Sequence, residues 1–160
     1  MYYFDLFEIP VSIYPDEALL ARKMISLQKK YHPDFYANCT DEERADALQK
    51  SSQINQAYKV LSHRDRIVHY ILDSHNLVEE GEKYKLPPDF LMEIMDINEI
   101  KMDDPGSEEW RLKSEALLQE LDEEIEPVLR SFDGSPASEK DLIEIKNWYY
   151  KKKYLYRLLA

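Results

Sequence analysis

Residues 31–34 of the chain are Tyr31, His32, Pro33 and Asp34, and they separate two stretches with helical periodicity. Pro33 disfavours helical geometry at His32 and has no backbone donor, so the first helix should end near Tyr31. We therefore expect these residues to form the loop of a helical hairpin. His32 and Asp34 then project from its tip, where a partner can reach them.

An amphipathic helix is predicted before this loop. Pro15, Asp16 and Glu17 open it, because proline and acidic residues are favoured in a first helical turn. Its apolar side chains recur at i, i+4, i+7 and i+11, so they lie on one face. These side chains are Leu20, Met24, Leu27 and Tyr31.

Basic residues of the same helix lie mostly off its apolar face. They are Arg22, Lys23, Lys29 and Lys30. Charged helix faces are usually only solvated, but this strip stands in a chain with a net charge of −11. Beside the loop tip, it is suited to steering the chain onto an acidic surface of a partner. The sequence does not settle which of the four side chains makes contact.

A second long helix is predicted after the loop. Thr40 and Glu43 have the spacing of a capping box, in which each side chain accepts from the backbone N–H of the other residue. The helix then runs to about Leu61, and we also expect a short helix within residues 4–9 and another that ends near Ser74. The expected apolar face of the long helix consists of Leu48, Ile54, Ala57, Tyr58 and Leu61.

Three more helices are predicted in the second half of the chain. The first begins near Pro88, because proline suits the first turn of a helix. The second runs from about Ser107 to Ser131, where Pro127 either kinks or ends it. Ser138 is expected to cap the third, which extends to the end of the sequence.

The helices divide into two groups, so the predicted fold class is all-α with two domains. The first domain covers residues 1–75 and the second covers residues 88–160, where three helices form a bundle. The polar stretch between them, residues 76–87, is predicted to be a linker. Only three glycines occur in 160 residues, and Leu, Lys, Glu and Ala are frequent, which argues against a β-rich fold.

The charge of the chain limits the classes of partner that it can bind. Residues 1–75 carry nine Lys/Arg against eleven Asp/Glu, whereas residues 76–160 carry twelve against twenty-one. Nucleic-acid binding draws its affinity from phosphate neutralisation, so this acidic balance argues against it. The aromatic and basic residues at 148–157 do not offset the acidic half around them. The asymmetry suggests that the two halves bind different partners.

The single cysteine, Cys39, excludes an internal disulfide and a cysteine-based metal cluster. The three histidines outside the loop have no partners at metal-ligand spacing, so we expect neither a metal nor another cofactor. No apolar run approaches the length of a membrane span, and the first residues lack a secretory signal. We therefore expect a cytoplasmic protein that binds neither membrane nor nucleic acid.

His32 and Asp34 allow two chemical interpretations. As a catalytic acid/base pair or a metal ligand set, they lack a nucleophile, a third ligand and a phosphate-binding loop. As a recognition element they have a clear rationale, because a carboxylate on a rigid loop accepts a bidentate hydrogen bond from an arginine of a partner. We therefore expect no catalytic residue in this chain, and direct enzymatic use of the pair is kept as an alternative hypothesis.

A second candidate surface lies on the helix that begins near Pro88. Periodicity alone favours Leu91 and Met95 as core residues of the bundle. The alternative is an exposed apolar patch with an acidic rim, a composition typical of a protein-binding site. Such a patch also allows weak self-association, so a homodimer stays open. The residues of this surface are Leu91, Met92, Met95, Asp96 and Glu99.

The four residues 31–34 between two such helices resemble a J-domain, and Ile54-Asn55-Gln56-Ala57-Tyr58 continue the likeness into the second helix. Over nearly its whole length the chain is similar to HscB, the family of iron–sulfur assembly co-chaperones. The segments that carry this resemblance are YFDLF at 3–7, QINQAY at 53–58 and DFLME at 89–93. The last segment distinguishes this family from other J-proteins.

The resemblance implies an L-shaped protein with a J-domain helical hairpin and a C-terminal three-helix bundle. It implies that His32, Pro33 and Asp34 trigger ATP hydrolysis in a DnaK/HscA-type chaperone, while Lys23 and Lys29 dock on the acidic surface of that partner. The bundle is expected to hold the iron–sulfur scaffold IscU. The family places this contact at Leu91, Met92, Met95, Asp96, Glu99 and Tyr154.

Some positions depart from the family pattern. Phe35 follows Asp34 where many J-domains carry a basic residue, and Asp96 has a shorter side chain than the glutamate expected there. The N-terminal cysteine-rich zinc module of animal relatives is absent, which favours a bacterial type. The alternative function is a J-domain protein that serves a different or general folding client.

Overall fold

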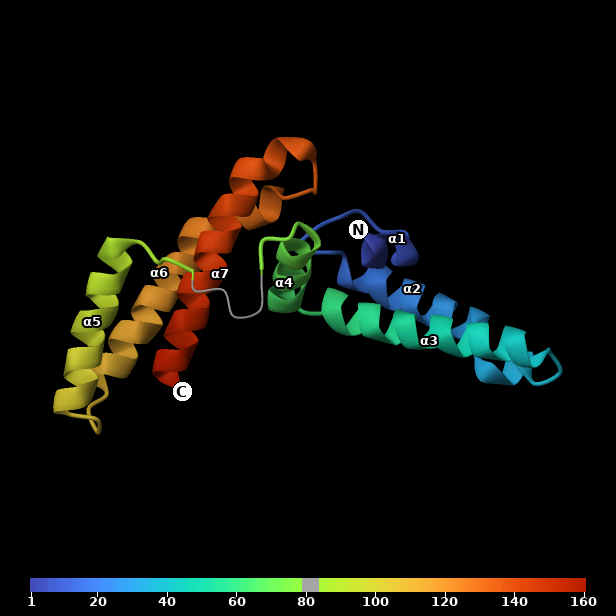
Figure 1. Ribbon diagram of the computed structural model, residues 1–160, viewed down its shortest axis with the longest axis horizontal. Helices are drawn as coiled ribbons and strands as arrows, with labels where there is room; N and C mark the ends of the chain where they lie inside the picture. The colour runs from blue at the N-terminus through green and yellow to red at the C-terminus, as the bar shows by residue number, and fades with distance from the viewer. Residues whose placement is uncertain (79–83) are drawn as a thin grey trace. The chain divides into compact units, whose positions relative to one another are not determined.

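The computed structural model describes residues 1–78 and 84–160, so residues 79–83 of the predicted linker lie outside the described part. Every regular element of the described residues is a helix (Figure 1). The chain forms two compact units, Met1–Ser74 (unit 1) and His75–Ala160 (unit 2). The all-α prediction is confirmed. Among the described helices, none has the length and hydropathy needed to cross a membrane.

Unit 1 is built around a hairpin of two long helices, α2 and α3, that run side by side (Figure 1). Helix α1 covers residues 2–7 instead of the predicted 4–9, because Glu8 adopts a left-handed conformation with a φ of 51° and ends it. The elements of unit 1 are α1 (Tyr2–Phe7), α2 (Glu17–Lys30), η1 (Pro33–Tyr36), α3 (Asp41–Leu61) and α4 (Arg64–Ser74), η1 being a short 3₁₀ helix.

Side-chain caps determine where the two long helices begin. Asp16 caps α2 and accepts a hydrogen bond of 2.8 Å from the backbone N–H of Leu19. The predicted capping box of α3 is present. The Thr40 hydroxyl accepts from the Glu43 N–H at 3.2 Å, and the Glu43 carboxylate accepts from the Thr40 N–H at 2.9 Å. Both caps satisfy backbone donors that a helix leaves unpaired at its first turn.

The core of unit 1 follows a seven-residue repeat along α3. Ala47, Ile54 and Leu61 are buried at i, i+7 and i+14, and Ala57 is buried between them. The predicted inclusion of Leu48 in this face is wrong, because its side chain is 64% exposed. Leu48 lies about 100° around the helix from Ala47 and therefore faces solvent.

The capping box should make a measurable contribution to the stability of unit 1. Thr40→Ala removes the hydroxyl acceptor, and we expect the free energy of unfolding of unit 1 to fall by about 1 kcal/mol. Both tryptophans, Trp110 and Trp148, belong to unit 2, so tryptophan fluorescence does not report on unit 1. Urea unfolding followed by backbone amide NMR signals of α3 measures the change. Thr40→Ser keeps the acceptor and should restore most of the stability.

Acid should remove the contribution of Glu43 to this cap. The backbone hydrogen bond from Thr40, followed by that from its hydroxyl, holds the pKa of Glu43 below its ordinary value of 4.5. A carboxylate with a lowered pKa stabilises the fold fully above the ordinary value, and this contribution is lost as the pH falls through the lowered pKa. Glu43→Gln should thus reduce stability at neutral pH and lose its effect in acid. An equal deficit at both pH values, or an equal effect of the control Glu42→Gln, would contradict this.

Unit 2 contains the predicted three-helix bundle. Helix α6 continues through Pro127 to Ser131, so the proline does not end it. Ser138 lies at the N-cap of α7, but its predicted capping role is wrong because its hydroxyl donates to the Ser135 carbonyl at 2.6 Å. The described elements of unit 2 are α5 (Pro88–Asp103), α6 (Glu109–Ser131), η2 (Pro136–Ser138) and α7 (Glu139–Leu159), η2 being a second 3₁₀ helix.

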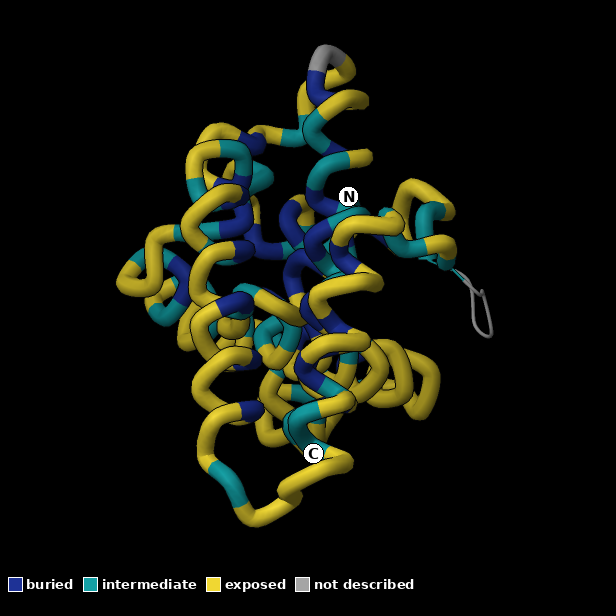
Figure 2. Tube along the Cα trace, turned by 90° about the vertical axis from the view of Figure 1, so that its left-hand side faces the viewer, coloured by how far each residue is buried: buried dark blue, intermediate teal, exposed yellow. Residues whose placement is uncertain are grey.

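The core of unit 2 contains an unusual buried cation. Lys152 is only 5% exposed, and its Nζ lies 3.8 Å from the Asp122 carboxylate and 4.7 Å from the centre of the Trp148 ring. Trp148 donates its indole N–H to the same carboxylate at 2.8 Å. This polar cluster joins α6 to α7. Along the helices, buried positions recur with exposed positions between them (Figure 2). Buried charges are tolerated when they are paired in this way.

Candidate functional site

The loop between α2 and α3 is a short turn held by its own hydrogen bonds. Helix η1 begins at Pro33, whose fixed φ suits a first helical turn. His32 caps this turn, because its Nδ1 accepts a hydrogen bond of 3.3 Å from the backbone N–H of Asp34. The Tyr36 hydroxyl donates to the Lys30 carbonyl at 3.1 Å and ties η1 to the end of α2. The predicted hairpin loop is therefore present, with a turn of helix inside it.

His32 and Asp34 project from this turn into solvent. Their side chains are 53% and 89% exposed, and the His32 Nδ1 lies 3.6 Å from the Asp34 carboxylate. Phe35 is 70% exposed, and its ring meets the His32 ring edge-on with 6.3 Å between the ring centres. An imidazole, a carboxylate and a phenyl ring thus form one exposed group that a partner can contact without any change in the fold.

The four basic residues of α2 occupy two adjacent faces. At about 100° per residue, Arg22 and Lys29 share the face opposite the buried Leu20, whereas Lys23 and Lys30 share the next one. Arg22, Lys29 and Lys30 are exposed, and Lys23 is half-buried. The basic strip therefore covers one broad side of α2 and extends to the end of the helix that carries the loop.

Lys23 has a partner within unit 1. Its Nζ lies 2.7 Å from the Glu8 carboxylate, which the left-handed end of α1 presents to α2. The hydrogen bond from Lys23, and next its charge, hold the pKa of Glu8 below its ordinary value. Arg22 and Lys29 form no ion pair with the described residues. These two are the cations of the strip most available to an acidic partner.

Helix α5 carries two apolar stripes, and only one of them faces the bundle. Phe90, Ile94 and Ile97 are buried in the core of unit 2. Leu91 and Met95 are 37% and 68% exposed, so the interpretation from periodicity that they are core residues is wrong. The helix packs against α6 and α7, and its buried residues form one stripe while the second stripe faces solvent.

The rest of the predicted scaffold surface is also exposed. Met92 is 64% exposed, and Asp96 and Glu99 are exposed beside it. Tyr154 of α7 is 37% exposed and lies near the second half of α5, where it lines a hollow together with Met102. The structure therefore places Leu91, Met92, Met95, Asp96 and Glu99 along one side of α5, with Tyr154 near its C-terminal end.

Met102 was missed by the sequence analysis. It is 82% exposed, the most of the exposed apolar side chains in the described residues. The signal that would have found it is spacing, because Leu91, Met95 and Met102 stand at i, i+4 and i+11 on one helix. These positions differ by no more than about 40° around the helix axis. We call Leu91, Met95 and Met102 the apolar stripe of α5.

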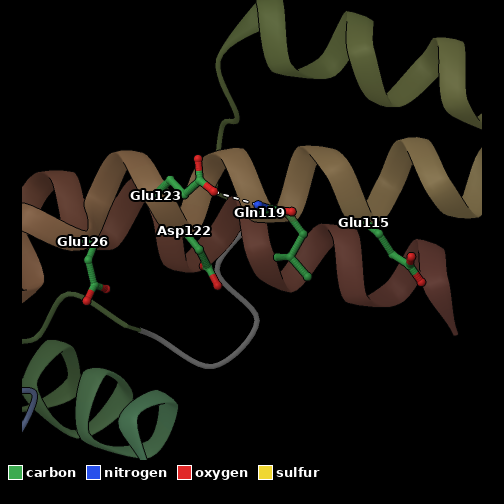
Figure 3. A pocket seen from close by; sticks show the side chains of 6 residues that line it. Glu115, Gln119, Asp122, Glu123 and Glu126 are labelled. Atoms are coloured by element: carbon green, nitrogen blue, oxygen red, sulfur yellow. Dashed lines mark hydrogen bonds between the residues drawn. The ribbon is translucent and has the colours of Figure 1, made fainter.

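One groove on α6 has a mainly acidic lining, since four of its six lining residues are Asp or Glu. A shallow groove of about 420 Å³ follows this helix (Figure 3). Gln119 donates its side-chain N–H to Glu123 at 2.7 Å, and Asp122 is the carboxylate already bound by Trp148. Some polar groups in the lining of this groove are therefore already hydrogen-bonded within unit 2. Its lining residues are Glu115, Leu118, Gln119, Asp122, Glu123 and Glu126.

The chain resembles known proteins along most of its length. A family model described as the HscB C-terminal oligomerisation domain matches residues 86–160. The co-chaperone protein HscB homolog of Vibrio campbellii is 33% identical over 142 residues, which are 88% of this chain and 81% of that protein. The chain belongs to the HscB co-chaperone family. The homolog of Vibrio parahaemolyticus is 39% identical over 100 residues, which are 62% of this chain and 58% of that protein.

Two solved HscB structures have the same helical fold. The chaperone HscB from Vibrio cholerae aligns with 99% of this chain and 93% of its own, with a TM-score of 0.61 and 28% identity. The human co-chaperone protein HscB aligns over 98% and 78%, with a TM-score of 0.70 and 29% identity. The expected membership of the HscB family is therefore confirmed, together with the all-helical fold that the resemblance implied.

Proposed function

We propose that this chain is a co-chaperone that stimulates ATP hydrolysis by a DnaK/HscA-type chaperone and delivers the iron–sulfur scaffold IscU to it. One observation carries the proposal: a chain of the HscB family exposes His32 and Asp34 at the tip of a helical hairpin. The hydrolysis is the chemistry of the chaperone. This chain biases the conformational equilibrium of its partner through differential binding and catalyses no reaction of its own.

The tip is suited to a directional contact with the chaperone. The cap that His32 forms holds the Asp34 backbone in place, so binding has to order the Asp34 side chain but not its backbone. A partner arginine can then bind both carboxylate oxygens. Arg22 and Lys29 supply positive potential beside the tip, which raises the association rate with an acidic surface.

The exposed side of α5 is suited to the scaffold. Leu91, Met92 and Met95 provide apolar area, and Asp96 and Glu99 form an acidic rim around it. Methionine side chains adapt to an irregular surface, because they are unbranched and polarizable. A chain that holds the scaffold with one unit and the chaperone with the other raises the effective concentration of the scaffold at the chaperone.

A steady-state ATPase assay tests the proposal. The rate of the candidate chaperone is measured alone, with this chain, with IscU, and with both. We expect this chain to raise the rate several-fold and the scaffold to raise it further. No stimulation by this chain overturns the proposal, as does ATP turnover by this chain without chaperone. Further stimulation by an unfolded protein and none by IscU would favour service to a general folding client.

A further inference from the structure

A hollow of about 610 Å³ opens between the C-terminal halves of α5 and α7. Tyr154 and Leu158 of α7 line one side of it, and Asn98 and Met102 of α5 line the other. The charged groups in its lining are both cations, Lys101 and Arg157. This composition stands out in unit 2, because residues 76–160 carry twelve Lys/Arg against twenty-one Asp/Glu.

The two cations of the hollow differ in their internal contacts. Lys101 donates from its Nζ to the Leu158 carbonyl at 2.6 Å and lies 4.3 Å from the centre of the Trp110 ring. The Lys101 ammonium group therefore forms contacts that join α5 to α7 and α6. Arg157 is exposed and forms no side-chain hydrogen bond or ion pair with the described residues. Its guanidinium is the cation in this lining that remains available to a partner.

The hollow is continuous with the apolar stripe of α5. Met102 belongs to both, since it is the last member of the stripe and a lining residue of the hollow. From Leu91 to Met102 the helix rises about 16 Å at 1.5 Å per residue. A partner that binds along the stripe from Leu91 to Met102 thus reaches the hollow at the Met102 end of the stripe. There it can contact Arg157.

We propose that this hollow receives an acidic side chain of the scaffold and that Arg157 selects it; this inference rests on the proposed function. Charge complementarity determines the chemistry of the occupant, because a guanidinium with no ion-pair partner among the described residues, in a partly apolar lining, favours a carboxylate. The planar guanidinium can donate two parallel hydrogen bonds to that carboxylate, and Met102 and Leu158 supply apolar lining in the same hollow. The scaffold segment therefore combines apolar residues along α5 with an acid at the end near Arg157.

Titration calorimetry of the full chain with IscU tests this assignment. Arg157→Gln should weaken the affinity about tenfold, as expected for a lost charge-assisted pair. It should also make the salt dependence of binding shallower, because one ion pair fewer is screened. Arg157→Lys keeps a cation in the last turn of α7 but loses the forked geometry, so its affinity should be intermediate. The matched control is Lys140→Gln, which removes one exposed charge from the first turn of the same helix.

The outcomes separate this inference from the proposed function. If IscU binds the wild type but Arg157→Gln binds like Lys140→Gln, the inference is overturned and the proposed function stands. If IscU does not bind the wild type, both are overturned. If Arg157→Gln changes only the monomer–dimer distribution in sedimentation equilibrium, the occupant is a second copy of this chain and the inference is also overturned. Circular dichroism of each variant confirms that the helices are intact.

Discussion

Asp34→Asn should abolish stimulation of the chaperone's ATPase while leaving the fold unchanged. Asparagine keeps the shape of the side chain but removes its charge, so the bidentate bond to a partner arginine is lost. Removing one partner of such a desolvated pair costs about 2–5 kcal/mol, which is roughly 30-fold to several-thousand-fold in affinity. Since the Asp34 side chain is 89% exposed in the free protein, its own stability should change by less than about 0.5 kcal/mol.

The ATPase assay measures this effect as a function of co-chaperone concentration. Asp46→Asn is the matched control, because it removes the same charge from an exposed position of α3 in the same unit. We expect the control to stimulate like the wild type. Stimulation by Asp34→Asn at the level of Asp46→Asn would show that the carboxylate at the tip has no role in activation, whatever the chain binds.

Leu91→Ala combined with Met92→Ala should weaken scaffold binding without affecting stimulation by the chain alone. Both side chains are exposed on α5, so their truncation removes contact area and leaves the core of the bundle intact. Two truncated apolar contacts are worth about 2–3 kcal/mol when a partner buries them, or roughly 30- to 150-fold in affinity. The stimulation should persist because His32 and Asp34 belong to unit 1.

A second double variant provides the control for this result. Leu112→Ala with Ile143→Ala truncates two exposed apolar side chains of unit 2, which are 61% and 56% exposed on α6 and α7. Calorimetric titration with IscU should show wild-type affinity for the control. Equal affinities for the two double variants would mean that the exposed side of α5 is not the surface that holds the scaffold.

Local signals in the sequence were sufficient to predict most of the fold. Asp16 and Thr40 begin α2 and α3 through caps that depend only on nearby residues, and Pro88 begins α5 as expected. Pro33 separates the two helices of the hairpin for the same local reason. Ser138 shows where such reasoning fails, because a neighbouring 3₁₀ turn offers its hydroxyl a carbonyl acceptor and the side chain donates to it.

Periodicity could not determine which apolar stripe of α5 is buried. Leu91 and Met95 follow a helical repeat as regular as that of Phe90, Ile94 and Ile97, and only the packing against α6 and α7 distinguishes them. The same limit applies to the contacts of cations. The spacing along α2 does not reveal that Lys23 meets a carboxylate fifteen residues earlier. In the same way, the spacing along α7 does not reveal that Arg157 lines a hollow with α5.

The ion pair between Lys23 and Glu8 turns any docking through Lys23 into an exchange. An incoming acid must displace a carboxylate that already lies at 2.7 Å, so the net gain is the difference between two similar contacts. A partner surface that offers one poorly oriented carboxylate obtains no net binding free energy from replacing Glu8. Docking through Lys23 lowers the free energy only when an acid of the partner contacts the lysine more favourably than Glu8 does. Competition from Glu8 therefore disfavours non-specific association at this lysine.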